Sequence, residues 1–90
     1  MASPTGPIDV SSAVANTVIL STAGNINAIA GRYHTEITFV CNAVGQSFTH
    51  NVNLLLSGGT SATSTVAGAA IIFRHEGAGV YREISRTTAF

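Results

Sequence analysis

Apolar and polar residues alternate with a period of two along most of the chain, which is the pattern of β-strands with one buried face. Residues 35–41 show it clearly, since one face carries Ile37, Phe39 and Cys41. The same pattern predicts five further strands, over residues 17–21, 25–29, 46–50, 70–75 and 79–85. Glycines separate these segments at intervals of roughly 8–12 residues, as in all-β domains. We expect an all-β fold, either a small β-sandwich or a β-helix-like module of short strands.

Another strand is expected over residues 51–56. Val52, Leu54 and Leu56 share one face and Leu55 points the other way, so this strand is predicted to be buried on both sides. The Ser/Thr/Gly-rich segment that follows is a predicted loop, and only the segment before the first strand offers a helical turn. These two segments are residues 57–64 and 11–16. The first seven residues are interpreted as a linker or chain start, which leaves residues 8–90 as a single β domain.

The last two strands are predicted to form a hairpin. A three-residue loop centred on Gly77 fits a bulged hairpin turn. This turn would pair Phe73 with Tyr81 and Ile71 with Glu83, and the two aromatic rings would share one face. Such a cross-strand pair contributes roughly 0.2–1 kcal/mol relative to two alanines.

Charge is scarce in this sequence. Only 9% of the 90 residues are charged, against 46% hydrophobic residues; there are four arginines and no lysine, and the net charge is +0. Soluble domains usually hold about 25% charged residues. The balance argues against intrinsic disorder, and the lack of a basic stripe argues against nucleic-acid binding. A monomer needs a charged, solvated surface, so we expect this chain to associate with copies of itself.

Other sequence features narrow the picture further. The one cysteine, Cys41, cannot form an intrachain disulfide and is expected to be an inert core thiol. No apolar run approaches the ~18 residues of a membrane-spanning helix, so membrane insertion is not expected. The N-terminus has no basic region followed by an apolar core and does not resemble a signal peptide.

The order of several short motifs resembles a known family. The segments are Ile-Asn-Ala-Ile-Ala-Gly, Glu-Ile-Thr-Phe, Leu-Leu-Leu-Ser-Gly-Gly, Gly-Ala-Ala-Ile-Ile-Phe and Tyr-Arg-Glu-Ile-Ser-Arg. Together they are similar to the C-terminal module of bacteriophage tailspikes and tail fibres, over residues 8–86. Such modules often close with an aromatic residue, a variable residue, Glu, Ile or Val, Ser and Arg, after an Asp-Gly turn. Here Tyr81 stands where Trp is usual, and Glu76 precedes Gly77 where Asp is usual.

The resemblance implies a homotrimer, intertwined or side by side, attached to the rest of a fibre or spike chain. It also implies synthesis in the host cytoplasm and a final location in the phage tail. Some phage fibre modules cleave themselves with a Ser–Lys pair, but this chain has no lysine. The parent protein of such a module can be a polysaccharide depolymerase, which this segment does not reveal.

Candidate catalytic groups do not form a recognisable site. Glycosidases need two carboxyl groups about 5–9.5 Å apart, whereas the four carboxylates here are scattered along the sequence. The three histidines have no zinc-site spacing, so no metal and no cofactor are predicted. His50 is the best candidate for a metal ligand on a threefold axis; the competing interpretation is a packed, hydrogen-bonded strand histidine.

The closing motif supplies most of the predicted interface. Adjacent side chains on a strand point to opposite faces, so Glu83 should not reach Arg82 within its strand, and Arg86 only with difficulty. We therefore predict that Glu83 forms an ion pair between subunits that fixes their register. The predicted structural and interface residues are Phe73, Tyr81, Arg82, Glu83, Ile84, Arg86 and Leu55. Possible carbohydrate contacts are Tyr33, Asn51 and Asn53.

Three functions are compatible with these features. The first is a structural module that holds three chains in register at the distal end of a tailspike or tail fibre, raising the effective concentration of the chain ends. The alternative is a receptor-binding tip that contacts host surface polysaccharide. The third is a depolymerase site completed between subunits, although no active site is recognisable within the chain.

Overall fold

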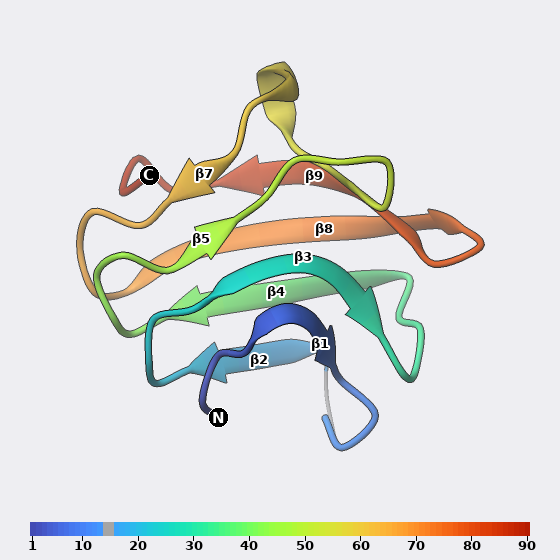
Figure 1. The fold of residues 1–90 in the computed structure, drawn as a ribbon, viewed down its shortest axis with the longest axis horizontal. Coiled ribbons are helices and arrows are strands. Elements are labelled where there is room, and N and C mark those ends of the chain that lie inside the picture. The colour runs from blue at the N-terminus through green and yellow to red at the C-terminus, as the bar shows by residue number, and fades with distance from the viewer. Residues whose placement is uncertain (14–15) are drawn as a thin grey trace.

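Two mixed β-sheets face each other across an apolar core in the computed structural model, which describes residues 1–13 and 16–90. Sheet A has the strand order β1-β3-β5-β7 and sheet B the order β2-β4-β8-β9-β6 (Figure 1). The strands are β1 Thr5–Asp9, β2 Thr17–Leu20, β3 Asn25–Ala30, β4 Glu36–Cys41, β5 Ser47–Phe48, β6 Leu54–Leu55, β7 Ala62–Thr63, β8 Ala69–Gly77 and β9 Val80–Arg86. A 3₁₀ turn, η1, covers Ser57–Gly59.

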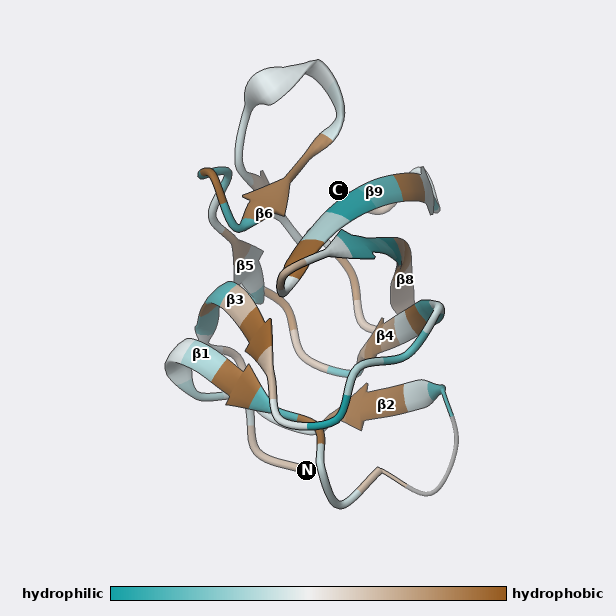
Figure 2. Ribbon diagram, turned by 90° about the vertical axis from the view of Figure 1, so that its right-hand side faces the viewer, coloured by the Kyte–Doolittle hydropathy of each residue, from teal (hydrophilic) through white to brown (hydrophobic). Residues whose placement is uncertain are grey.

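The first half of the chain winds as a coil through both sheets. It passes from sheet A to sheet B and back with each strand, and β1, β3 and β5 are parallel neighbours, as are β2 and β4. Thr5 lies beside Asn25 and Thr17 beside Thr38, so equivalent positions recur after 20 or 21 residues. The coils stack from β1 and β2 at one end of the molecule towards β5 (Figures 1 and 2).

The second half closes the other end with mostly antiparallel strands. Strand β7 pairs antiparallel with β5, β8 with β4, and β9 with β8, while the short β6 runs parallel to β9. This end of both sheets therefore finishes in strands of two residues, whereas the end at β1 and β2 finishes in strands of five and four residues.

Three phenylalanines join the sheets at the centre of the core. Phe48 of sheet A lies 5.6 Å from Phe39 and 5.7 Å from Phe73, both from sheet B, measured between ring centroids. These separations are those of favourable tilted aromatic pairs. The predicted inward face of β4 is confirmed, since Ile37, Phe39 and Cys41 are fully buried. Burial raises the pKa of the Cys41 thiol to about 11.

The strands with regular alternation agree with the sequence prediction, and the short ones do not. Of residues 46–50 only Ser47–Phe48 form a strand, and of residues 51–56 only Leu54–Leu55. Val52 does not share the buried face, since it is 80% exposed. The predicted loop contains strand β7. Part of the proposed helical turn, residues 14–15, lies outside the described residues.

The interpretation of residues 1–7 as a linker is wrong for Thr5, Gly6 and Pro7, which open β1. Proline is tolerated there because β1 is an edge strand and its register shifts between Gly6 and Pro7.

The hairpin forms, but its predicted register is wrong. Gly77 lies opposite Val80, so the turn consists of two residues, Ala78 and Gly79, with φ of 52° and 78°. A type I′ turn needs positive φ at both central positions, and its twist matches that of the strands. An extra residue in β8, Glu76, then shifts the register by one, so Phe73 lies opposite Glu83 rather than Tyr81. Phe73 and Tyr81 nevertheless share the buried face, as predicted, and both are fully buried.

Candidate functional site

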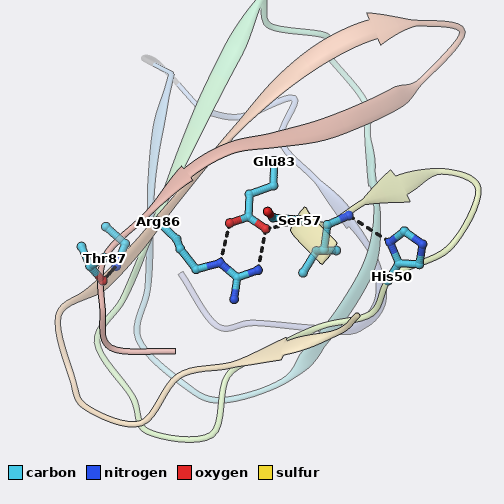
Figure 3. A network of polar contacts seen from close by, with 7 residues as sticks. His50, Ser57, Glu83, Arg86 and Thr87 are labelled. Carbon is cyan, nitrogen blue, oxygen red and sulfur yellow. Dashed lines mark hydrogen bonds and ion pairs between the residues drawn. The ribbon is translucent and has the colours of Figure 1, made fainter. Parts of the chain in front are cut away.

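Among residues 1–13 and 16–90, Glu83 is the one charged residue in the buried class. Its Oε2 accepts a hydrogen bond from Arg86 Nε at 2.5 Å, and its Oε1 accepts one from Arg86 Nη2 at 2.7 Å (Figure 3). The backbone N–H of Ser57 also donates to Oε1, at 2.9 Å. Paired arginine–carboxylate bonds of this kind are short and strong.

A β-bulge in β9 explains how Arg86 reaches Glu83 within one strand. Glu83 lies opposite Phe73 and Ser85 opposite Ile72, so Ile84 is an extra residue in the ladder. Ile84 and Ser85 are both exposed, and Arg86 returns to the side of Glu83. The expectation that Arg86 reaches Glu83 only with difficulty is therefore wrong: the two residues are paired inside one chain, which removes the reason for expecting an ion pair between subunits.

Two opposing effects act on the Glu83 carboxyl. Burial alone would raise its pKa, but the hydrogen bonds from Arg86 and Ser57 outweigh burial and hold the pKa below its usual value. The hydrogen bond to Glu83 raises the pKa of Arg86 in turn. Glu83 is therefore ionised at neutral pH with both oxygens engaged, which suits it to a structural role rather than to proton transfer.

His50 binds the backbone next to the Ser57 N–H that Glu83 accepts. Its Nδ1 accepts the backbone N–H of Leu56 at 3.0 Å, one residue before the N–H that Glu83 accepts (Figure 3). We call Glu83, Arg86 and His50, with the Leu56–Ser57 backbone, the clamp. The interpretation of His50 as a hydrogen-bonded histidine fits this contact. Within the described residues no group of three or more His, Cys, Asp or Glu side chains could hold a metal ion.

Two open grooves border the clamp, with volumes of about 470 and 420 Å³. Both are lined by Ser57, Gly58 and Glu83, and the second also by His50. Glu83 is the one carboxylate among the residues that line them. The grooves therefore lack the pair of carboxyl groups that glycoside hydrolysis requires.

The predicted interface residues divide into three groups. Phe73 and Tyr81 belong to the core, and Glu83 and Arg86 to the clamp. The others lie on the outer side of sheet B: Leu55, Arg82 and Ile84. Arg82 forms a second, exposed ion pair there, with its Nε 2.8 Å from Glu76 Oε2.

Tyr81 anchors a small aromatic cluster at the hairpin end. Its hydroxyl oxygen accepts the backbone N–H of His34 at 3.1 Å, and burial raises the pKa of its phenol. The His75 ring lies 4.8 Å from Tyr81 and stacks on Tyr33 at 4.6 Å. Of the predicted carbohydrate contacts, Tyr33 is the one aromatic residue, and it is 55% exposed.

The side chain of Asn51, a predicted sugar contact, forms hydrogen bonds within the chain. Its amide nitrogen donates to the carbonyl oxygens of Asn27 and Thr49, at 2.8 and 2.9 Å, and its Oδ1 accepts the N–H of Asn53. Asn53 is exposed, and its carbonyl oxygen accepts the N–H of Tyr81. Asn51 and Asn53 therefore fix the turn before β6.

A buried polar group at the corner of the coil escaped the sequence analysis. Gln46 is fully buried, and its Oε1 accepts the N–H of Gly24 at 2.9 Å while its Nε2 donates to the carbonyl of Ser47. Its backbone N–H donates to Ser64 Oγ. The bond to Gly24 joins successive coils. A glycine shortly before each of the two neighbouring strands, Gly24 before β3 and Gly45 before β5, marks this corner in the sequence.

The outer faces of the two sheets differ in chemistry. Sheet A presents hydroxyl and amide groups that bond to each other, with Thr49 Oγ1 donating to Asn25 Oδ1 at 2.6 Å and Ser47 Oγ 2.9 Å from Thr63 Oγ1. Sheet B carries six aliphatic side chains at the outward positions of its strands, together with polar ones such as Thr38 and Arg74. We call these six residues the apolar face: Ile19, Val40, Leu55, Ala70, Ile72 and Ile84.

The apolar face crosses all five strands of sheet B. Ile19 lies beside Val40, and Val40 beside Ala70, so three neighbouring strands form a continuous aliphatic row. Ile19 is 52% exposed and Ile84 39%. Two-sided apolar character was predicted only around Leu55. The run Ala-Ala-Ile-Ile-Phe in β8 carries the same signal.

No family model, curated protein or solved structure matches this chain. In the part of the chain that the structure describes, no helix is long and apolar enough to cross a membrane.

Proposed function

We propose that this chain is an assembly module that joins two further copies of itself through the apolar face and holds three chains in register. The observation that carries the proposal is the contrast between the outer faces of the two sheets. Sheet A turns hydrogen-bonding groups to solvent, whereas sheet B turns aliphatic groups outward. A contiguous exposed apolar surface is typical of an interaction site.

The distribution of charge on sheet B supports the same proposal. Glu36 lies beside Arg74, and Arg74 beside Arg82, so these charges gather at one end of the face. Val40 and Ala70 lie at the other end of the same two strands. If the aliphatic end of this face is buried in an interface, the charged end lies at its edge. Interfaces usually have a polar rim of this kind.

The trimeric state and the setting in a phage tailspike or tail fibre rest on the resemblance of residues 81–86 to the ending of such modules. In this chain the motif builds the clamp, which ties β9 to the Leu56–Ser57 backbone. Ile84, next to Glu83 in the strand, points to the opposite side and lies on the apolar face, and the bulge turns Ser85 outward beside it. The closing motif thus supports both a stable fold and a surface for self-association.

Sedimentation velocity and native mass spectrometry test the proposal on the whole chain. We expect a particle of three 9.2 kDa chains at micromolar concentration. Ile72→Lys places a charge on the apolar face and should yield monomers. Asn27→Lys, its matched control on the outer face of sheet A, should remain trimeric. A monomeric parent chain, or equal dissociation of both variants while circular dichroism shows both folded, contradicts the proposal.

One observation favours a second function, contact with a carbohydrate. The exposed Tyr33 ring is held flat against His75, with centroids 4.6 Å apart and planes 20° apart, so it offers a fixed aromatic surface. Aromatic platforms of this kind suit the apolar side of a sugar ring. A glycan array probed with the parent chain and with Tyr33→Ala tests this function. Binding that is lost with the ring supports it, and no binding by the parent chain refutes it.

A further inference from the structure

Two histidine rings accept backbone hydrogen bonds in this fold. His75 Nε2 accepts the N–H of Gly79 at 3.1 Å, and His50 Nδ1 accepts the N–H of Leu56 at 3.0 Å. An imidazole nitrogen accepts a hydrogen bond only while it carries no proton, so both contacts need a neutral ring. Protonation turns each acceptor into a donor that faces another donor. Histidine is the side chain that ordinarily changes charge between about pH 5 and 8, so mild acid acts on both contacts.

Both hydrogen bonds secure backbone that flanks strand β9. Gly79 is the second residue of the turn that leads into β9. Leu56 belongs to the loop that Glu83 of β9 also binds, at the next residue (Figure 3). This loop follows β6, which is itself a neighbour of β9. His75 therefore holds the turn at the start of β9, and His50 holds the loop beside its second half.

The groups around His75 do not replace the bond that protonation breaks. Its ring lies 4.6 Å from the Tyr33 ring and 4.8 Å from the Tyr81 ring, between centroids. Aromatic rings attract a cation, so they retain the charged ring and it is the turn that moves. The charged groups of the strands packed against it lie on the outer face of sheet B: Glu36, Arg74, Glu76 and Arg82. On the loop before β4 the titratable groups are Arg32, Tyr33 and His34.

Ion pairing does not compensate a charge on His75 either. Within residues 1–13 and 16–90 the ion pairs are those of Arg82 and Arg86, so no carboxylate is paired with His75. On the neighbouring loop, His34 Nε2 is buried without a hydrogen-bond partner. The side of sheet B on which His75 lies therefore offers no acceptor that a second ring proton could bind.

The surroundings of His50 are balanced in charge. Its ring lines the groove of about 420 Å³ together with two charged residues, Arg82 and Glu83. Both already belong to ion pairs, with Glu76 and Arg86 respectively. A proton on His50 therefore breaks the bond to the loop, and the lining of the groove holds no unpaired carboxylate that could receive it.

We propose that His75 and His50 are a pH-sensitive switch for the two segments that flank β9: the neutral rings hold the turn and the loop, and protonation between about pH 7 and 5 releases both while the core stays folded. The pair of Glu83 and Arg86 persists over this range, because hydrogen bonds hold the pKa of Glu83 below its usual value. Acid then acts in two steps, first at the histidines and, below about pH 4.3, at Glu83. Both histidine contacts lie within one chain, so the switch does not depend on assembly.

Two substitutions remove the titrating ring and keep the acceptor. Glutamine places its Oε1 where histidine has Nε2, asparagine places its Oδ1 where histidine has Nδ1, and neither amide titrates. His75→Gln therefore keeps the bond from Gly79 at every pH, and His50→Asn keeps the bond from Leu56. Each variant is the control for the other, because it changes one acceptor and leaves the second histidine in place.

Amide hydrogen exchange, followed by NMR on the whole chain, reports the protection of each backbone N–H at each pH. From about pH 7.5 to about pH 5 the parent should lose protection by about tenfold at Gly79 and at Leu56. The midpoint of each loss should match the titration of the bound ring, followed by its imidazole signals. His75→Gln should keep protection at Gly79 alone, and His50→Asn at Leu56 alone. Amides of the central strand β4 should stay protected in all chains.

Three results would each overturn the proposal. The first is constant protection of both amides in the parent over this pH range. The second is equal loss at Gly79 in His75→Gln, or at Leu56 in His50→Asn, which would show that another group causes the release. The third is loss of protection in β4 together with the two amides, which would show that the whole domain unfolds. The parent measurements decide the first and third even if a variant does not fold.

Discussion

Replacement of Glu83 by glutamine removes the charge of the clamp and keeps its shape. The Glu83 side chain is 3% exposed and accepts three hydrogen bonds, two from Arg86 and one from the Ser57 backbone. Glutamine can accept with its one carbonyl oxygen, but its NH₂ group faces a donor. Glu83→Gln therefore leaves the Arg86 guanidinium short of a partner in a partly buried position.

The size of the effect follows from the exposure of the two partners. Removal of one member of a fully buried pair costs about 3–5 kcal/mol, whereas a hydrogen bond to a charged group is worth about 1.5–3 kcal/mol. The Arg86 side chain is 28% exposed, so water can partly solvate its charge. We expect a loss of about 2 kcal/mol, which for a domain of this size lowers the melting temperature by about 8–16 °C.

Thermal unfolding followed by circular dichroism at pH 7 measures this loss. Glu76→Gln is the matched control, because it makes the same substitution in the exposed ion pair with Arg82, whose side chain is 51% exposed. Exposed pairs are screened by water and contribute little. A Glu83→Gln chain that melts within a degree or two of the parent, or no lower than Glu76→Gln, would refute the assignment of Glu83 as a structural anchor.

Three other changes test separate parts of the structure. Ala78→Asn should raise stability to urea by up to about 1 kcal/mol, because Ala78 has a left-handed φ that asparagine adopts more readily. Tyr81→Ala should cost about 3–5 kcal/mol in the same assay, and Tyr81→Phe about 1–2 kcal/mol, because the His34 N–H loses its acceptor. Since the folded-state pKa of Glu83 is lowered, its contribution is present at pH 7 and disappears as the pH falls below about 4.3 through that lowered value. Acidification should therefore lower the melting temperature of the parent more than that of Glu83→Gln.

Period-two alternation located β2, β3, β4, β8 and β9 but not the five-residue β1, in which Ile8 is the one buried residue. β4 is an example, because Ile37, Phe39 and Cys41 all point into the core. The two-residue strands β5, β6 and β7 carry no period of their own. They form because neighbouring coils supply hydrogen-bonding partners, and that information lies in residues far away along the chain.

The stacking of the coils did leave a signal in the sequence. Ile8 and Ile29 lie 21 residues apart, as do Leu20 and Cys41. Both pairs are parallel neighbours in the structure. The first residues of β1 do not share this spacing, because Thr5 and Gly6 pair with Asn25 and Ile26, which lie 20 residues further along the chain. The repeat therefore does not show that β1 begins within the first seven residues.

The clamp could be predicted only in part, because its pairing depends on a β-bulge in β9. Alternation correctly separates Arg82 from Glu83, but it also assigns Arg86 to the wrong side unless one residue bulges. The bulge at Ile84 depends on the register of β9 against β8, which the two-residue turn at Ala78 and the extra residue Glu76 set together. The residues of the site were therefore readable from the sequence, whereas their pairing was not.

The same bulge connects the clamp with the proposed assembly surface. It makes two consecutive residues, Ile84 and Ser85, point outward, which returns Arg86 to Glu83 and leaves Ile84 on the apolar face. Loss of the clamp can therefore shift Ile84 and weaken self-association indirectly. Ile84→Lys removes the surface contact while Glu83 and Arg86 keep their bond. If Ile84→Lys dissociates the trimer while the monomers stay folded, assembly and folding are separate, because assembly alone depends on contacts of the outer face.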